Sequence, residues 1–251
     1  MKKIVDNAGK YFRHFGIVML LAIVLTSFTR TGNEKYNCKT KSNPAQQDDD
    51  GWVMLFDGKT TNGWRGTMGK PFPVDGWKIE NGVLTALEGE PGDNIVTEKM
   101  YSDFDLRLEF KIQPKANSGV KYFVLEGGYR KGSTLGLEYQ IVDDSRIQGD
   151  PTGDSKKLAS LYAIYASGPT HPNPPGEWNE IRIYAKGKYV EHWLNGEKVL
   201  SFTRGTKDFR ERVAQSKFKD CKKFGEAKKG LIMLQDHSDE VSYRNVRIKE
   251  L

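Results

Sequence analysis

The chain has 251 residues, of which 37% are hydrophobic and 29% are charged, with 26 glycines and 10 prolines. This composition is typical of a folded globular protein and excludes collagen-like, coiled-coil and multi-spanning membrane proteins. The net charge of +6 comes from residues 1–50 and 204–229, and the remainder of the chain is mildly acidic. Because the excess of basic over acidic residues is confined to two short stretches, we expect no nucleic-acid partner.

The beginning of the chain has the pattern of an export signal. Residues 1–14 hold four lysines and arginines, and an uninterrupted apolar run follows over 15–25. A basic segment followed by about eleven apolar residues is typical of a secretion signal, whereas a permanent anchor needs roughly twenty. We therefore predict an export signal at 1–29. An uncleaved anchor and lipidation at Cys38 remain alternatives.

Residues 30–50 are polar and show no apolar periodicity, so we predict a flexible tether there and a folded domain over 51–251. Cys38 lies in the tether and Cys221 in the domain. Two cysteines do not make a disulfide framework, and whether these two pair stays open. The fold must then rest on the burial of apolar side chains, for which about 200 residues are enough.

Strand patterns and turn signals recur through the predicted domain. The clearest pattern is 104–112, where five apolar residues alternate with four charged ones, which predicts a strand with one buried and one solvated face. Asn-Gly pairs at 81–82 and 195–196 lie between apolar segments and predict two hairpin turns. In chain order, the predicted strands cover 77–79, 83–87, 104–112, 118–126, 137–142, 180–185, 188–194, 198–202, 230–235 and 241–249.

One segment has a helical pattern instead. Between Thr206 and Phe218, Phe209 and Val213 stand four residues apart, and two acidic residues lie near the start. We interpret its many lysines and arginines as a solvated face rather than a partner site. With about a dozen strands and no alternation of strands and helices, the sequence predicts an all-β fold. We expect a jelly-roll β-sandwich with a short helical insertion near 206–218.

The sequence lacks the motifs of several common chemistries. It has no Gly-x-Ser-x-Gly, no phosphate-binding Gly-Lys-Ser/Thr loop, no His-Glu-x-x-His and no cysteine pair at zinc spacing. Four aspartates between 143 and 154 do not follow the calcium-loop pattern. Retaining glucanases with this architecture carry two glutamates on one strand, about 5 Å apart, and no such spacing occurs here.

Two polar residues on the predicted strand 137–142 are the first candidates for a ligand site. Glu138 and Gln140 share one face of 137–142, opposite three apolar residues, so both side chains can reach one ligand. The alternative is an ordinary solvated strand face. Asp143 and Asp144 follow directly at the end of the strand.

A second group of candidates stands at the end of a later strand. Gln235, Asp236 and His237 close the segment that begins at Gly230. His237 is the best candidate for a group that titrates near neutral pH, although a lone histidine is more often structural. Four tryptophans could stack on sugar rings or serve as core anchors: Trp64, Trp77, Trp178 and Trp193.

At these residues the sequence resembles a known family, and the motifs that carry the resemblance occur in order along the whole domain. They are Gly51–Thr60, Gly63–Trp64, Trp77–Leu84, Asn117–Phe123, Gly136–Asp144, Pro175–Asn179, Trp193–Gly196, Gly230–His237 and Arg244–Lys249. Together they are similar to the 3-keto-disaccharide hydrolase family. The resemblance implies a concanavalin-A-like jelly roll and export to the periplasm or cell surface of a Gram-negative bacterium. The insert at 206–229 departs from shorter family members and could alter one rim of a ligand groove.

The resemblance also implies a reaction. Its substrate would be a glycoside whose C3 hydroxyl has been oxidised to a ketone, which acidifies the proton on C2. A base removes that proton, the C1 substituent leaves, and water adds to the resulting enone. We assign Glu138 as acid/base, with Lys121, His237 and Gln140 polarising the ketone or carrying the second proton.

Substrate-binding roles follow from the same resemblance. Asp143 and Asp144 would orient ring hydroxyls, and a divalent cation beside them stays open, although we expect no resident cofactor. Asn117, Trp178 and Gln235 would shape the pocket. The expected partner is a small carbohydrate, whereas a functional link to a sugar 3-oxidoreductase and the oligomeric state stay open. The alternatives are a non-catalytic carbohydrate-binding module and a structural domain, because one fold hosts all three roles.

Overall fold

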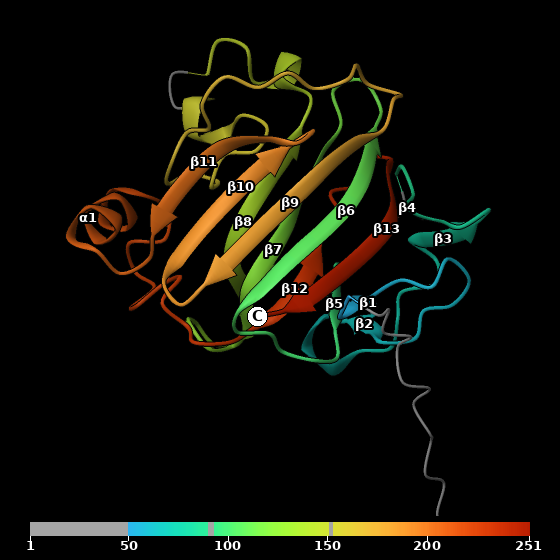
Figure 1. Cartoon of the computed structure of the whole chain (residues 1–251), viewed down its shortest axis with the longest axis horizontal. Helices are drawn as coiled ribbons and strands as arrows, with labels where there is room; N and C mark the ends of the chain where they lie inside the picture. The colour runs from blue at the N-terminus through green and yellow to red at the C-terminus, as the bar shows by residue number, and fades with distance from the viewer. Residues whose placement is uncertain (1–49, 90–92, 151–152) are drawn as a thin grey trace, which may run out of the picture. The chain divides into compact units, whose positions relative to one another are not determined.

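Two antiparallel β-sheets face each other in the computed structural model, which describes residues 50–89, 93–150 and 153–251 (Figure 1). The strands of the larger sheet are β1 (Trp52–Met54), β3 (Trp77–Glu80), β4 (Val83–Ala86), β6 (Phe104–Ile112), β9 (Asn179–Lys186), β10 (Tyr189–Leu194), β11 (Glu197–Thr203) and β13 (Val241–Glu250). Those of the smaller sheet are β2 (Trp64–Gly66), β5 (Ile95–Thr97), β7 (Asn117–Glu126), β8 (Thr134–Val142) and β12 (Leu231–Leu234).

The order of the strands brings distant parts of the chain together. The larger sheet runs β11-β10-β9-β6-β13-β4-β3, with β1 added to β13, and the smaller runs β2-β5-β12-β7-β8. In the smaller sheet, β12 lies between β5 and β7 although it comes about a hundred residues later in the chain. Long crossovers between two sheets are the mark of a jelly roll, and the predicted β-sandwich is confirmed.

The helical insertion is also confirmed. The helix α1 (Lys207–Gln215) begins after Thr206, whose hydroxyl oxygen accepts a hydrogen bond from the backbone N–H of Phe209 at 3.2 Å. Such a side-chain cap satisfies an amide that the first turn leaves unpaired. Phe209 and Val213 are buried in the core, whereas the basic residues of the helix are exposed.

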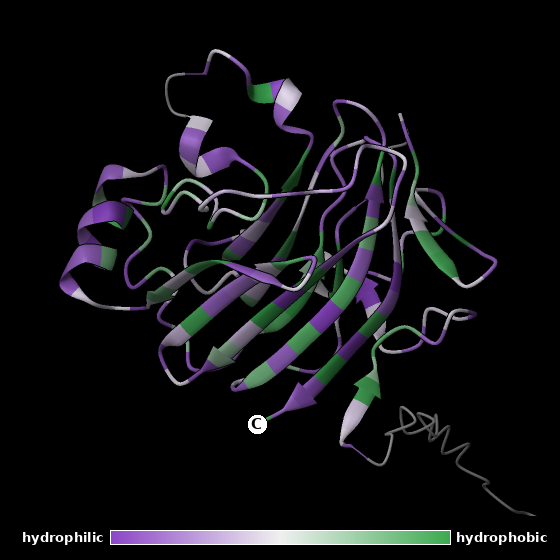
Figure 2. Cartoon of the chain, turned by 45° about the horizontal axis from the view of Figure 1, so that its top comes forward, coloured by the Kyte–Doolittle hydropathy of each residue, from purple (hydrophilic) through white to green (hydrophobic). Residues whose placement is uncertain are grey.

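The hydrophobic core lies between the sheets because the strands alternate. Figure 2 shows hydrophilic and hydrophobic residues in turn along the strands of the larger sheet. In β6, Phe104, Leu106 and Phe110 are fully or almost fully buried, and the charged residues between them face outward. The bounds of β6 agree with the strand predicted at 104–112. Three-residue strands such as β1, β2 and β5 were not predicted, because so short a segment shows no period.

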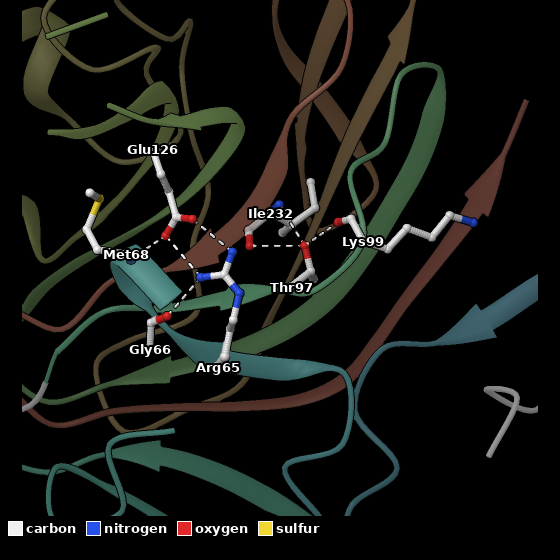
Figure 3. A network of polar contacts seen from close by, with 7 residues as sticks. All are labelled: Arg65, Gly66, Met68, Thr97, Lys99, Glu126 and Ile232. Atoms are coloured by element: carbon white, nitrogen blue, oxygen red, sulfur yellow. Dashed lines mark hydrogen bonds and ion pairs between the residues drawn. The ribbon is translucent and has the colours of Figure 1, made fainter. Parts of the chain in front are cut away.

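A polar network ties the first strands of the chain to the smaller sheet (Figure 3). The guanidinium of Arg65 donates two hydrogen bonds to the carboxylate of Glu126, at 3.0 and 2.8 Å. Beside it, the hydroxyl of Thr97 donates to the carbonyl of Lys99 at 2.8 Å and accepts from the N–H of Ile232 at 3.0 Å. These contacts hold β2 and β5 against β7 and β12.

A loop segment continues the smaller sheet beyond its edge strand β8. The N–H of Gln140 donates to the carbonyl of Ser160 at 3.1 Å, and the N–H of Tyr162 donates to the carbonyl of Glu138 at 3.0 Å. Segment 158–162 therefore lies directly against the strand that carries both candidate residues. Two short 3₁₀ turns, η2 (Asp144–Ile147) and η3 (Gly153–Lys156), precede it, and a third, η1 (Thr67–Gly69), follows β2.

The predicted export signal at 1–29, almost all of the tether at 30–50, and Cys38 lie outside the described residues. Cys221 is buried near the helix. Within the part of the chain that the structure describes, no helix is long and apolar enough to cross a membrane.

Candidate active site

The candidate site lies on the outer face of the smaller sheet, where β7 and β8 pair. Val120 and Tyr122 of β7 point into the core between the sheets, so the residues that alternate with them point outward. The register places Lys121 opposite Glu138 and Gly119 opposite Gln140. A carboxyl group, an ammonium group and an amide therefore lie close together on the outer face of the smaller sheet.

Lys121 and Glu138 form an ion pair at the centre of this area. The ammonium nitrogen lies 3.5 Å from Glu138 Oε2, and the side chain of Glu138 is only 7% exposed. Burial raises the pKa of Glu138 above its ordinary value, because the charged form loses its hydration. The positive charges of Lys121 and Lys217 oppose that rise. A carboxyl group whose pKa is raised by burial is suited to act both as a general base and as a general acid.

Gly119, two residues before Lys121 on β7, makes room for the side chains of the site. A Cβ placed on Gly119 would lie 2.5 Å from Gln235 Oε1 and 2.9 Å from Glu138 Oε1. The side chains of Gln235 and Glu138 therefore occupy the space above the glycine Cα atom. Gly119 was not among the predicted site residues, although a glycine inside a strand is a known sign of close approach by another group.

Two buried amide oxygens in the site have no partner among the described residues. Gln140 donates from Nε2 to Asn117 Oδ1 at 2.9 Å, but its own Oε1 is buried and unpaired. Gln235 Oε1 is buried and unpaired in the same way. Both residues are 4% exposed. Because buried polar atoms are nearly always hydrogen-bonded, these oxygens are ready to accept from the hydroxyl groups of a ligand.

His237 stands at the mouth of the site, two residues after Gln235. Its surroundings lower its pKa, mainly through partial desolvation and next through the positive charge of Lys121. The imidazole is therefore neutral at pH 7 and able to accept a proton. Arg146, whose guanidinium pairs with Asp239 at 2.5 Å, adds a further cation nearby.

Lys217 is a site residue that the sequence analysis missed. It follows helix α1 and acts electrostatically on both Glu138 and His237. Its ammonium nitrogen lies 4.1 Å from the centre of the Tyr162 ring. The only sequence signal was the basic insert, which we interpreted as a solvated face, because nothing local indicates which lysine turns toward the site.

Asp143 and Asp144 lie at the edge of the site, in the loop after β8. Asp143 accepts hydrogen bonds from the backbone N–H groups of Lys115 at 2.7 Å and Ser145 at 3.0 Å. Asp144 accepts from the N–H of Leu158 at 2.8 Å. In the described part of the chain, no three side chains of the His, Cys, Asp and Glu types are grouped as metal ligands would be. The carboxylates instead hold the loop that leads to segment 158–162.

Trp178 is not brought to this area. It precedes β9, and its ring lies against Lys111 of β6 at 5.2 Å and Arg244 of β13 at 4.1 Å. Both of these cations lie on the outer face of the larger sheet, so Trp178 and Glu138 are on opposite sides of the sandwich. The other predicted site residues, listed by number, do gather around β7 and β8: Asn117, Lys121, Glu138, Gln140, Asp143, Asp144, Gln235 and His237.

A jelly-roll sandwich with an acid–ammonium pair beside unpaired amide oxygens is compatible with a carbohydrate-active enzyme. The chain belongs to the family described as the 3-keto-alpha-glucoside-1,2-lyase-like domain, whose sequence model matches residues 51–249. It is 34% identical over 233 residues to the 3-keto-disaccharide hydrolase of Bacteroides thetaiotaomicron. That alignment covers 81% of this chain and 80% of the relative. The resemblance seen in the sequence is confirmed.

Solved structures agree with this assignment. A Parabacteroides distasonis protein named as a glycosyl hydrolase superposes with a TM-score of 0.71 at 36% identity, covering 80% of this chain and 94% of that one. A second protein from the same organism, named in the same way, gives a TM-score of 0.61 at 26% identity, covering 80% of this chain and 99% of that one. The chain is a glycoside hydrolase, and its substrate is a carbohydrate.

Proposed function

We propose that this enzyme cleaves glycosides whose C3 hydroxyl has been oxidised to a ketone, by elimination across C1 and C2 followed by addition of water. The observation that carries the proposal is the buried Glu138–Lys121 pair, which joins one titrating carboxyl group to one ammonium. The charged groups that act on Glu138 in the described chain are lysines, not a second carboxylate. Paired-carboxylate hydrolysis needs two carboxyl groups, whereas elimination beside a ketone needs a base and a cation.

In the first step, the Glu138 carboxylate removes the proton from C2, and the electrons of the C–H bond form an enolate with the C3 ketone. Lys121 stabilises the negative charge that develops on the ketone oxygen. The enolate then re-forms the ketone and expels the C1 oxygen, leaving a double bond between C1 and C2. Glu138, now protonated, gives its proton to the departing oxygen, so that one residue serves as base and then as acid.

In the second step, water adds to C1 of the enone. His237 lies exposed at the mouth of the site and is neutral, so it can take a proton from that water as the oxygen bonds to C1. The enolate that forms again lies beside Lys121. The enolate takes a proton at C2 from the protonated His237. This transfer restores both the ketone and the neutral imidazole. The net reaction is hydrolysis.

Binding of the sugar ring falls to the amide side chains. Sugar hydroxyls that donate to Gln140 Oε1 and Gln235 Oε1 would satisfy the two buried acceptors that lack a partner. Asn117 holds the amide of Gln140 in place through the 2.9 Å hydrogen bond. Asp143 and Asp144 would reach ring hydroxyls only at the edge of the site.

The substrate must be made by another enzyme. A 3-keto sugar arises when an oxidoreductase removes a hydride and a proton at C3, so we propose that this hydrolase acts after a sugar 3-oxidoreductase. We also propose that it works after export, to the periplasm or the cell surface. The basic and apolar pattern of residues 1–29 supports that location.

The test is the release of free sugar from a 3-keto-glucoside by the full chain, with the unoxidised glucoside as the control. We expect cleavage of the keto sugar alone, and a loss of at least about 100-fold in kcat for Glu138→Gln. The acid limb of the pH–rate profile should also lie above the ordinary glutamate pKa, because burial raises it. Cleavage of the unoxidised glucoside, or full turnover by Glu138→Gln, would contradict the mechanism. Binding of both glucosides without cleavage would favour a carbohydrate-binding module.

A further inference from the structure

Lys217 is the one residue of the basic insert that the structure brings to the site, and the proposed reaction does not use it. It lies just beyond helix α1, and its ammonium nitrogen is 4.1 Å from the centre of the Tyr162 ring and 5.2 Å from that of Phe218. A cation this close to an aromatic face is held there by the ring quadrupole. The charge therefore has a defined position although the side chain is exposed.

Tyr162 connects this lysine directly to the catalytic strand. Its backbone N–H donates to the carbonyl of Glu138 at 3.0 Å, so the two residues lie side by side across the edge of the sheet. The next residue, Ala163, has a φ of 61°, in the left-handed region that residues other than glycine seldom adopt. Lys217 is near enough for its charge to act on both Glu138 and His237. It thus stands at the mouth of the same site.

The ammonium group of Lys217 also has no ion-pair partner among the described residues. Other basic side chains at the site have carboxylate partners: Lys121 pairs with Glu138, and Arg146 pairs with Asp239. In the described chain no carboxylate lies within ion-pair distance of Lys217. In the same insert, by contrast, helix residues such as Arg210 and Arg212 are paired with acidic side chains. An ammonium that is positioned but unpaired is suited to an anion that arrives with a ligand.

We propose that Lys217 and Tyr162 form a subsite that binds an anionic substituent of the substrate, a carboxylate carried on or beside an aromatic or sugar ring of the leaving group. The proposal rests on the function proposed above, because it places this subsite at the mouth of the cleavage site. The ammonium would pair with the carboxylate, and the exposed part of the tyrosine ring would contact the ring that bears it. The chain would then prefer acidic glycosides over neutral ones of the same shape.

The expected preference is modest because the subsite is open to water. Exposed ion pairs contribute little, so we expect the carboxylate to raise kcat/KM about two- to fivefold over the neutral analogue at low salt. The gain should appear in KM rather than in kcat, since the contact is the same in the ground and transition states. Added salt should reduce it, because an exposed pair is screened.

The experiment compares phenyl and 4-carboxyphenyl 3-keto-glucosides as substrates for the wild type and for Lys217→Met. The control is Lys222→Met, which removes another exposed lysine of the same insert. We expect Lys217→Met to lose the preference for the carboxylate, measured as the ratio of kcat/KM for the two substrates, because this ratio cancels any change that the lost charge causes at Glu138 and His237. The control Lys222→Met should keep the wild-type ratio. An unchanged preference in Lys217→Met, or no preference in the wild type, would overturn the proposal.

A binding measurement separates this proposal from the proposed function. Calorimetry with the unoxidised 4-carboxyphenyl and phenyl glucosides requires no cleavage. If the wild type cleaves neither keto substrate, the proposed function fails. The subsite still stands if the carboxylate binds the wild type about two- to fivefold more tightly than it binds Lys217→Met. Equal binding by the two proteins would refute the subsite whatever the activity.

Discussion

His192 allows a quantitative prediction about stability, because it is a titratable side chain sealed inside the core. It lies in β10 with no exposed surface, and its Nδ1 is 2.8 Å from the carbonyl oxygen of Ala159. A carbonyl only accepts, so Nδ1 carries the proton, and Nε2 accepts from the hydroxyl of Tyr122 at 2.8 Å. The neutral ring thereby links the larger sheet to the segment that covers the catalytic strand.

Burial lowers the pKa of His192 from 6.5 to about 4. As the pH falls, the unfolded chain therefore takes up this proton first, which favours unfolding. The stabilisation is fully present above pH 6.5 and is lost as the pH falls toward 4. This difference between the pKa values of the folded and unfolded chain corresponds to about 3 kcal/mol of the free energy of unfolding. About 2 kcal/mol of it is lost between pH 7 and pH 4.5.

The assay is urea unfolding at pH 7, 5.5 and 4.5 and constant ionic strength, for the wild type and His192→Phe. We expect the variant to be less stable at pH 7 by about 2–4 kcal/mol, since two buried partners lose their hydrogen bonds. Its free energy of unfolding should then fall by about 2 kcal/mol less than that of the wild type on acidification. His171→Phe, which changes an exposed histidine, is the control and should keep the wild-type stability at pH 7. Parallel pH curves for the wild type and His192→Phe would refute the reasoning.

Two further predictions concern the smaller sheet. Gly119→Ala should lower kcat/KM about 100-fold, because the new Cβ would displace the side chains of Gln235 and Glu138. Its thermal unfolding should stay near that of the wild type. Unchanged turnover would contradict this prediction. Arg65→Met should lower the free energy of unfolding, measured in urea, by about 1–3 kcal/mol, since it leaves the partly buried Glu126 without its partner. It should leave kcat/KM unchanged. Equal stability of the variant and the wild type would show that this ion pair contributes nothing.

Much of the architecture follows from local patterns. The alternation over 104–112 gives the bounds of β6, and the Asn-Gly pair at 195–196 gives the turn between β10 and β11. The cap at Thr206 and the spacing of Phe209 and Val213 give the helix. These signals are visible because each depends on residues within a few positions of one another. The candidate residues on 137–142 were found in the same way, from an alternation that the folded strand preserves.

What only the tertiary structure decided is which distant residues meet. Trp178 was predicted to shape the pocket, but it precedes a strand of the larger sheet, and strand order is set by long-range pairing. Lys217 lies at the site although it is 79 residues away from Glu138 in the sequence. It is placed there by its contact with Tyr162, which no local sequence pattern predicts. The sequence by itself determined the longer strands, the helix and the family. The packing of one sheet, one loop and one insert around Glu138 decided which charges it faces, because side-chain electrostatics depends on distance in space and not along the chain.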